Sequence, residues 1–195
     1  MEGLSDEALI RRAKQGDVDV FMELAEKYKT RIYQTIFMMT MNHSDADDLS
    51  QETFMHAFKY LSKFKQKSSF YTWLYRIAVN LTLNFLKKKN REKTKMPFLQ
   101  EQALSKEDVK YRQISPEKQS LRKELRQNLE DAIHSLPVTY RTAFILVVLQ
   151  DMSHGQTAKI LKCSENTISW RMHQARKMLQ ERLSSYFRRG ENDVS

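Results

Sequence analysis

The chain has 195 residues, enough for one ordinary domain or two small ones, and its 4 Gly and 3 Pro are few for a protein with many tight turns. Its single cysteine, Cys163, excludes an internal disulfide and a multi-cysteine zinc site. The N-terminal segment MEGLSDEALIRR lacks the order of a signal peptide, and no apolar run is long enough to cross a bilayer. We therefore expect a cytoplasmic protein without membrane insertion.

The formal net charge is +9, and it is spread unevenly along the chain. Residues 1–60 carry 7 basic and 11 acidic side chains, whereas residues 61–116 carry 13 basic and 4 acidic ones. A basic middle indicates a polyanion such as nucleic acid, or a membrane surface. The acidic first third indicates a different partner, such as another protein.

The first ninety residues predict four helices. Ser5 caps the first, which Gly16 ends, and Asp17 caps a second that runs to about Met41. Ser44 is expected to cap the third helix, whose apolar residues recur at helical spacing. A basic loop at 62–69 precedes the fourth helix, which we expect from about Phe70 to Asn90. Residues 91–114 show no sustained apolar face and are interpreted as a linker.

The last third predicts a second helical domain. Ser115-Pro116 starts a helix to about Ser135, on which Leu121, Leu125, Leu129 and Ile133 are expected to point inward. The next helix spans 138–150, with Phe144, Ile145, Val148 and Leu149 in its core. The fold class is therefore all-α, with two small helical domains at 1–90 and 115–185, a flexible linker at 91–114 and a tail at 186–195.

A helix-turn-helix is predicted near the C-terminus. Ser153 and Gln156 fit a capping box, Lys162-Cys163 forms a tight turn, and Ser164 starts a second helix. That helix is expected to present a polar surface suited to the DNA major groove. Its members are Asn166, Thr167, Ser169, Trp170, Arg171, His173, Gln174 and Lys177. The alternative is a structural helical hairpin with a solvated polar face.

Basic and aromatic side chains alternate in the middle of the chain, a composition that suits single-stranded DNA. The basic and amide candidates are Lys63, Lys65, Arg76, Asn80, Asn84, Lys87 and Lys88. The aromatic residues Phe70 and Trp73 are more often core residues than base platforms. Lys87 and Lys88 could also belong to a solvated helix end.

No enzyme signature or metal site is expected. The chain has no Gly-rich phosphate loop, nucleophile elbow or His-Glu zinc motif, and its histidines lack metal-ligand spacing. Metal binding by the acidic stretch around Asp45, Asp47 and Asp48 is possible in principle, but acids near a helix N-terminus explain it more simply. We expect no catalytic residue, no cofactor and no small-molecule substrate.

Two segments resemble a known family. The stretch DADDLSQETFMHAFKYL, followed by FKQKSSFYTWLYRIAVNLTLNFLKKKNR, is similar to region 2 of extracytoplasmic-function sigma factors. The stretch LEDAIHSLPVTYRTAFILVVLQDMSHGQTAKILKCSENTISWRMHQARKML is similar to their region 4. This resemblance covers about residues 5–90 and 117–183. It implies a factor that directs core RNA polymerase to promoters.

The resemblance also implies roles for particular residues. Asp48, Gln51, Glu52 and Phe54 match the helix that docks on core polymerase. The loop at 62–69 and the helix through Asn80 and Asn84 match the part that opens and reads the single-stranded −10 element. The helix from Ser164 matches the reader of the duplex −35 element. Many relatives are also held inactive by an anti-sigma factor, which would be a further partner.

Several positions depart from the family pattern. Asp is common where Asn84 stands, Glu where Gly155 stands, and Gly where Lys162 stands, which places Lys162 in a strained turn.

Two other classes of protein share part of the pattern. A stand-alone helix-turn-helix regulator would have no use for the basic aromatic middle, and a sigma mimic that only sequesters a regulator would have no use for the basic faces.

Overall fold

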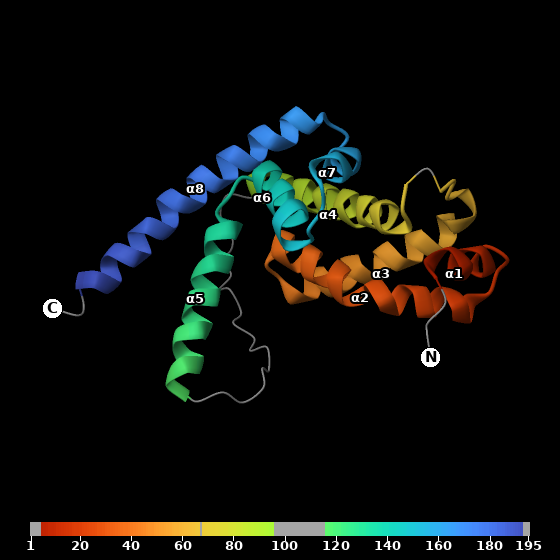
Figure 1. The fold of residues 1–195 in the computed structure, drawn as a ribbon, viewed down its shortest axis with the longest axis horizontal. Coiled ribbons are helices and arrows are strands. Elements are labelled where there is room, and N and C mark those ends of the chain that lie inside the picture. The colour runs from red at the N-terminus through yellow and green to blue at the C-terminus, as the bar shows by residue number, and fades with distance from the viewer. Residues whose placement is uncertain (1–4, 67, 96–115, 193–195) are drawn as a thin grey trace.

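The computed structural model describes residues 5–66, 68–95 and 116–192, and every regular element among them is a helix. Figure 1 shows a bundle formed by the first four α-helices, with α7 lying against α4, α6 packed against α8 and α2, and α5 and α8 extending outward. The expected all-α class and the two helical domains are confirmed.

The first domain contains α1 (Asp6–Ala13), α2 (Val18–Thr40), α3 (His43–Tyr60), the short 3-10 helix η1 (Leu61–Lys63) and α4 (Phe70–Lys95). The predicted caps Ser5 and Asp17 are confirmed, because each side chain accepts a hydrogen bond from a backbone N–H of the following helix. The predicted cap Ser44 is wrong. Asn42 caps α3, its side-chain oxygen accepting from Asp45 N at 2.8 Å, and this leaves Ser44 inside the first turn.

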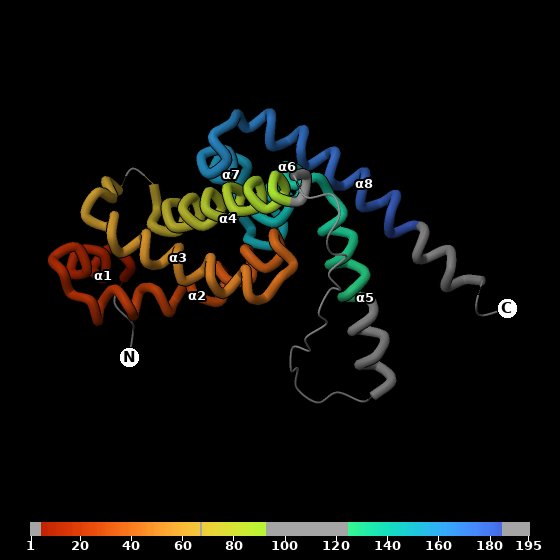
Figure 2. Tube along the Cα trace, turned by 180° about the vertical axis from the view of Figure 1, so that it is seen from behind, coloured from red at the N-terminus to blue at the C-terminus, as the bar shows by residue number. Residues whose placement is uncertain are grey.

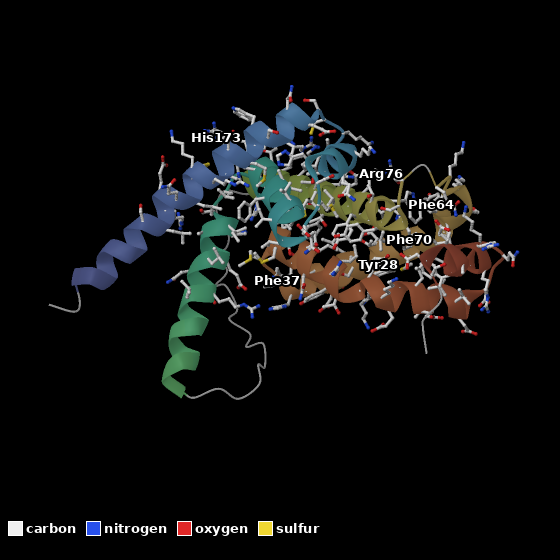
Figure 3. All side chains as sticks on the ribbon, viewed as in Figure 1. Tyr28, Phe37, Phe64, Phe70, Arg76 and His173 are labelled. Carbon is white, nitrogen blue, oxygen red and sulfur yellow. The ribbon has the colours of Figure 1, made fainter. Side chains whose placement is uncertain are left out.

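Aromatic and branched side chains fill the first domain. Leu24, Ile32 and Leu74 are fully buried, and the rings of Tyr28 and Phe70 meet between α2 and α4 with centroids 5.7 Å apart. Figure 3 shows Tyr28, Phe70 and Phe64 along this interior. Phe70 is a core residue, as the simpler reading predicted, whereas Trp73 is half-buried against Phe64 and Phe70. This packing fixes which face of α4 is left for a partner.

The fourth helix is longer than the sequence predicted. It continues through Arg91 to Lys95, five residues past the expected end at Asn90. No Gly or Pro interrupts the sequence until Pro97, so nothing local stops the helix earlier. The rest of the predicted linker, 96–114, lies outside the described residues, as does the predicted cap Ser115.

The second domain contains α5 (Pro116–His134), α6 (Val138–Phe144), the π-helical turn η2 (Ile145–Leu149), α7 (His154–Leu161) and α8 (Glu165–Asn192). The capping box is confirmed, with Ser153 and Gln156 making both of its hydrogen bonds. The helix α8 continues to Asn192, so residues 186–192 of the predicted tail are helical. Its sequence has no helix breaker before Gly190.

Some apolar residues expected in the core are exposed. Leu125 and Leu129 are 57% and 42% exposed because this part of α5 extends away from the bundle, whereas Ile133 near its end is buried. Val148 and Leu149 are also exposed. They lie in the π-helical turn, which has more residues per turn than an α-helix and so changes which side chains face the core. Phe144 is half-buried and Ile145 is buried as predicted. The side chain of Leu121 lies outside the described part.

The two domains pack together through α4, which contacts α7, and through α2, which contacts α5, α6 and η2. Figure 2 shows α7 beside α4 from the opposite direction, in agreement with Figure 1. The hydroxyl of Tyr71 donates to the backbone oxygen of Gln150 at 3.0 Å, which ties α4 to the segment before α7.

No described helix combines the length and the apolar character that crossing a membrane requires.

Candidate nucleic-acid interface

The helix-turn-helix consists of α7, the three-residue turn 162–164 and the start of α8. Lys162 adopts the left-handed conformation with φ 51°, as expected from the glycine that the family pattern has at this position, and its N–H donates to Ala158 O. Ser164 Oγ then accepts from Thr167 N at 3.1 Å and caps α8. Ala158, Ile168 and Met172 form a small core that holds the two helices together. The recognition helix therefore rests on a well-defined support.

Local hydrogen bonds occupy three of the predicted reading residues. Thr167 Oγ1 lies 2.8 Å from Ser164 Oγ at the helix start. Ser169 Oγ lies 3.0 Å from His154 Nδ1 of α7. Arg171 is half-buried, with its guanidinium 4.0 Å from Cys163 Sγ. These side chains are held against the domain and are less free to reach a base edge.

Residues other than Thr167, Ser169 and Arg171 form the face of α8 that lies opposite its buried side. Ile168, Met172 and Ala175 are buried, and exposed side chains recur on the other side at intervals of three and four residues. These outward residues are Asn166, Trp170, His173 and Lys177. Figure 3 places His173 on α8. Arg171 and Gln174, which the sequence also assigned to the presented polar surface, are half-buried at the edge of this face.

A second polar surface runs along α4. The spacing of Arg76, Asn80, Asn84 and Lys87 puts them on one side of the helix, away from the buried Leu74, Ala78 and Thr82. Arg76, labelled in Figure 3, and Asn80 are half-buried, and Asn84, Lys87 and Lys88 are exposed. A surface hollow at the end of this stripe is lined by Asn84, Lys87, Lys88, Arg91 and Glu92.

Arg91 is a candidate that the sequence reasoning missed. It was assigned to the linker, yet it lies on the continuing helix, four residues after Lys87. The uninterrupted run of helix-forming residues was the available signal. Arg91 lengthens by one turn the basic stripe of α4, which is formed by Arg76, Asn80, Asn84, Lys87 and Lys88.

Lys63 and Lys65 are exposed on and just after η1, and the Lys63 ammonium lies 5.3 Å from the Tyr60 ring centroid.

A third surface lies on α3. Asp48, Gln51 and Glu52 are exposed on one side of the helix, and Met55, 71% exposed, adds an apolar side chain one turn further along. Phe54 does not join them, because it packs partly into the core. Met55 was not identified from the sequence as part of this face. Its position four residues after Gln51, which places both side chains on the same side of a helix, would have indicated it. This face therefore combines carboxylates, an amide and an apolar side chain, which suits a protein partner.

The first residue of the acidic stretch, Asp45, takes part in packing, whereas Asp47 and Asp48 are exposed. Asp45 accepts a hydrogen bond from Lys89 Nζ at 2.6 Å and ties α3 to α4. Within the described ranges no three histidine, cysteine or acidic side chains gather as metal ligands would.

Comparison with known proteins identifies both domains. Residues 24–92 match the family model for Sigma-70 region 2, and residues 126–179 match that for Sigma-70 region 4. The chain is 33% identical over 184 residues to an ECF RNA polymerase sigma-E factor of Haemophilus influenzae, covering 93% of this chain and 97% of that protein. The chain belongs to the extracytoplasmic-function (ECF) family of RNA polymerase sigma factors.

A second ECF relative supports the assignment, and two solved structures share the fold. The factor SigW of Bacillus subtilis is 32% identical over 180 residues, covering 89% of this chain and 94% of SigW. The sigma factor RpoE of Bartonella quintana, solved with the anti-sigma factor NepR, is 24% identical with a TM-score of 0.69, covering 84% of this chain and 96% of RpoE. CnrH, solved with the cytosolic domain of CnrY, is 21% identical with a TM-score of 0.67, and the match covers 92% of this chain and 97% of CnrH. These two structures show the same fold.

The side chain of Glu165 crowds the position of Gly155 in the helix-turn-helix. A Cβ atom added at Gly155 would stand 2.9 Å from Glu165 Oε1. The Glu165 side chain therefore occupies the space beside residue 155.

Proposed function

We propose that this ECF sigma factor binds core RNA polymerase and directs it to promoters by recognising the −35 element in duplex form and the −10 element as a single strand. The observation that carries the proposal is the presence of two separate DNA-compatible surfaces on one chain, the outward face of α8 and the basic stripe of α4. A regulator that binds only duplex DNA would need only the first of these surfaces.

The two surfaces suit different forms of DNA. The exposed part of α8 carries amide, imidazole, indole and ammonium groups, which can contact base edges and phosphates in the major groove. On α4, Asn80 and Asn84 are flanked by Lys87, Lys88 and Arg91, an arrangement in which cations follow a strand while amides meet unpaired bases. Unstacking a base costs a few kcal/mol, and contacts to the freed strand offset that cost.

The α3 face is proposed to dock on core polymerase. Its exposed Asp48, Gln51 and Glu52 lie in the acidic part of a basic protein, and Met55 supplies an apolar contact. Carboxylates repel DNA, so a protein is the better partner for this face. We also propose an anti-sigma partner, supported by the fold shared with RpoE, which was solved bound to NepR. The factor contributes binding free energy and no chemistry, and it acts in the cytoplasm, where the chromosome is.

Promoter opening provides the test. With the factor and core polymerase present, permanganate should detect unpaired thymines around −10, and neither component alone should produce the signal. Lys87→Ala combined with Lys88→Ala should reduce opening more than it reduces closed-complex formation, and it should lower the salt dependence of binding. The matched control is Arg11→Ala with Lys29→Ala, which removes the same charge from exposed sites on α1 and α2. Normal opening by the α4 variant would contradict the melting role.

A further inference from the structure

The indole of Trp170 is the largest apolar group on the outward face of α8. It is 53% exposed, and it lies one turn after Asn166 and one turn before His173, both of which are exposed and polar. Water contact with so much apolar surface is unfavourable, and a tryptophan with only a packing role would be more completely buried. An apolar group in the middle of a polar reading face suggests an apolar feature on the ligand.

Tyr140 holds this indole from the neighbouring helix. It lies in the first turn of α6 and is half-buried, and its ring meets that of Trp170 edge-to-face, with centroids 5.5 Å apart and planes at 81°. Such aromatic pairs add a specific stabilisation beyond area burial. The two helices are themselves fixed by contacts among Ala143, Ile168 and Met172. The indole is therefore supported on one side and open on the other.

A supported indole loses less conformational freedom on binding than a free one. The major groove presents one apolar group that could occupy the open side, the C5-methyl of thymine. The polar neighbours Asn166 and His173 would remain available for the base edges on either side.

We propose that Tyr140 is a positioning residue of the −35 surface, which orients Trp170 so that its open side contacts a thymine methyl in the duplex. This inference rests on the proposed function of the second domain, and it adds a residue of α6 to a surface otherwise confined to the recognition helix. The hydroxyl of Tyr140 has no part in the role, so phenylalanine should replace it.

The first test is selection of −35 sequences from a library by holoenzyme containing each variant. Trp170→Ala and Tyr140→Leu should both lose thymine preference at the same position, by about two- to tenfold, the size expected for one aromatic contact. The double variant should lose no more than Trp170→Ala alone, and Tyr140→Phe should keep the preference. Retained preference in Tyr140→Leu, a uniform loss at every −35 position, or loss in Tyr140→Phe would each overturn the proposal.

The second test uses free protein and does not depend on transcription. The chain has 2 tryptophans, so Trp73→Phe leaves Trp170 as the only indole fluorophore. In that background Tyr140→Leu should increase acrylamide quenching of Trp170, whereas Tyr140→Phe should leave it unchanged. Unchanged quenching in Tyr140→Leu would overturn the positioning role. Quenching that rises as expected, combined with a wild-type holoenzyme that has no −35 preference, would instead contradict the proposed function and with it the thymine contact.

Discussion

The hydroxyl of Tyr75 in α4 donates a hydrogen bond to the side-chain oxygen of Gln150, 2.7 Å away, and this bond joins the two domains of the chain. Tyr75 is fully buried, and burial raises the pKa of its phenol far above the ordinary value. It therefore remains a donor across the physiological pH range. Because Tyr71 also bonds to Gln150, one residue accepts from two tyrosines of α4.

Replacing Gln150 by Leu should remove the acceptor of the buried Tyr75 hydroxyl, which then keeps only its interactions with Thr35 and Tyr71. The expected cost is roughly 1–3 kcal/mol of unfolding free energy, measured by urea denaturation. The matched control is Tyr75→Phe in the same chain, because removal of both polar partners should recover most of the loss. A Gln150→Leu protein as stable as wild type, or a double variant no better than the single one, would show that the bond does not hold the domains together.

Lys162→Gly should stabilise the protein. The lysine is held at φ 51°, where a Cβ atom is unfavourable and glycine is not, so a gain of roughly 0.5–1 kcal/mol is expected. Lys159→Gly, inside the neighbouring helix α7, should do the opposite by about 1 kcal/mol because helix interiors disfavour glycine. Thermal unfolding of the Lys162→Gly and Lys159→Gly variants would measure the gain in stability of the first and the loss in the second. Equal destabilisation by the two substitutions would mean that the lysine side chain stabilises the turn.

Acid should weaken the attachment of α1. Burial opposes ionisation of Asp6, but hydrogen bonds from Lys27 and Tyr28 outweigh it and hold its pKa below the ordinary 3.8. The folded state then binds fewer protons than the unfolded state at low pH, so stability is present above about pH 4 and is lost as the pH falls through the folded pKa. Asp6→Asn should flatten stability against pH in this range, and Asp19→Asn, at an exposed site on α2, is the charge-matched control. A curve for Asp6→Asn as steep as that of wild type would contradict this role.

Gln51→Ala combined with Glu52→Ala should weaken binding to core polymerase while leaving helix content intact. Both side chains are exposed on α3, so their removal opens no cavity in the core. Adding Met55→Ala should weaken binding further, because it removes the exposed apolar side chain of the same face. A pull-down would measure the effect, with Glu23→Ala and Glu26→Ala on α2 as the control. Equal polymerase affinity in all variants would remove the docking role from α3.

Helix starts and turns were predictable because their causes are local. The capping box of Ser153 and Gln156 needs residues only three apart. The left-handed Lys162 was expected because the family pattern has glycine, the residue that best tolerates this conformation, at its position. The error at Ser44 has the same origin, because Asn42 also caps well and the sequence offers no means of choosing between them.

Contacts between distant residues were not predictable. The pairing of Ser169 with His154 and of Trp170 with Tyr140 depends on how α7 and α6 pack against α8. The spacing of Leu125 and Leu129 predicted burial, but α5 extends beyond the elements that could cover them. The period of a helix shows which residues share a face, and only the tertiary packing shows whether that face is covered.

The most direct test of the account is transcription by purified core polymerase from a library of genomic fragments, with and without this protein. RNA should start at discrete sites only when the protein is present, and the DNA upstream of these sites should share a −35 and a −10 sequence at fixed spacing. The free protein should bind the same fragments weakly, because polymerase is needed to bring both surfaces to the DNA together. Nanomolar, sequence-specific binding by the free protein, with no new start sites from the mixture, would contradict the account and indicate a stand-alone regulator.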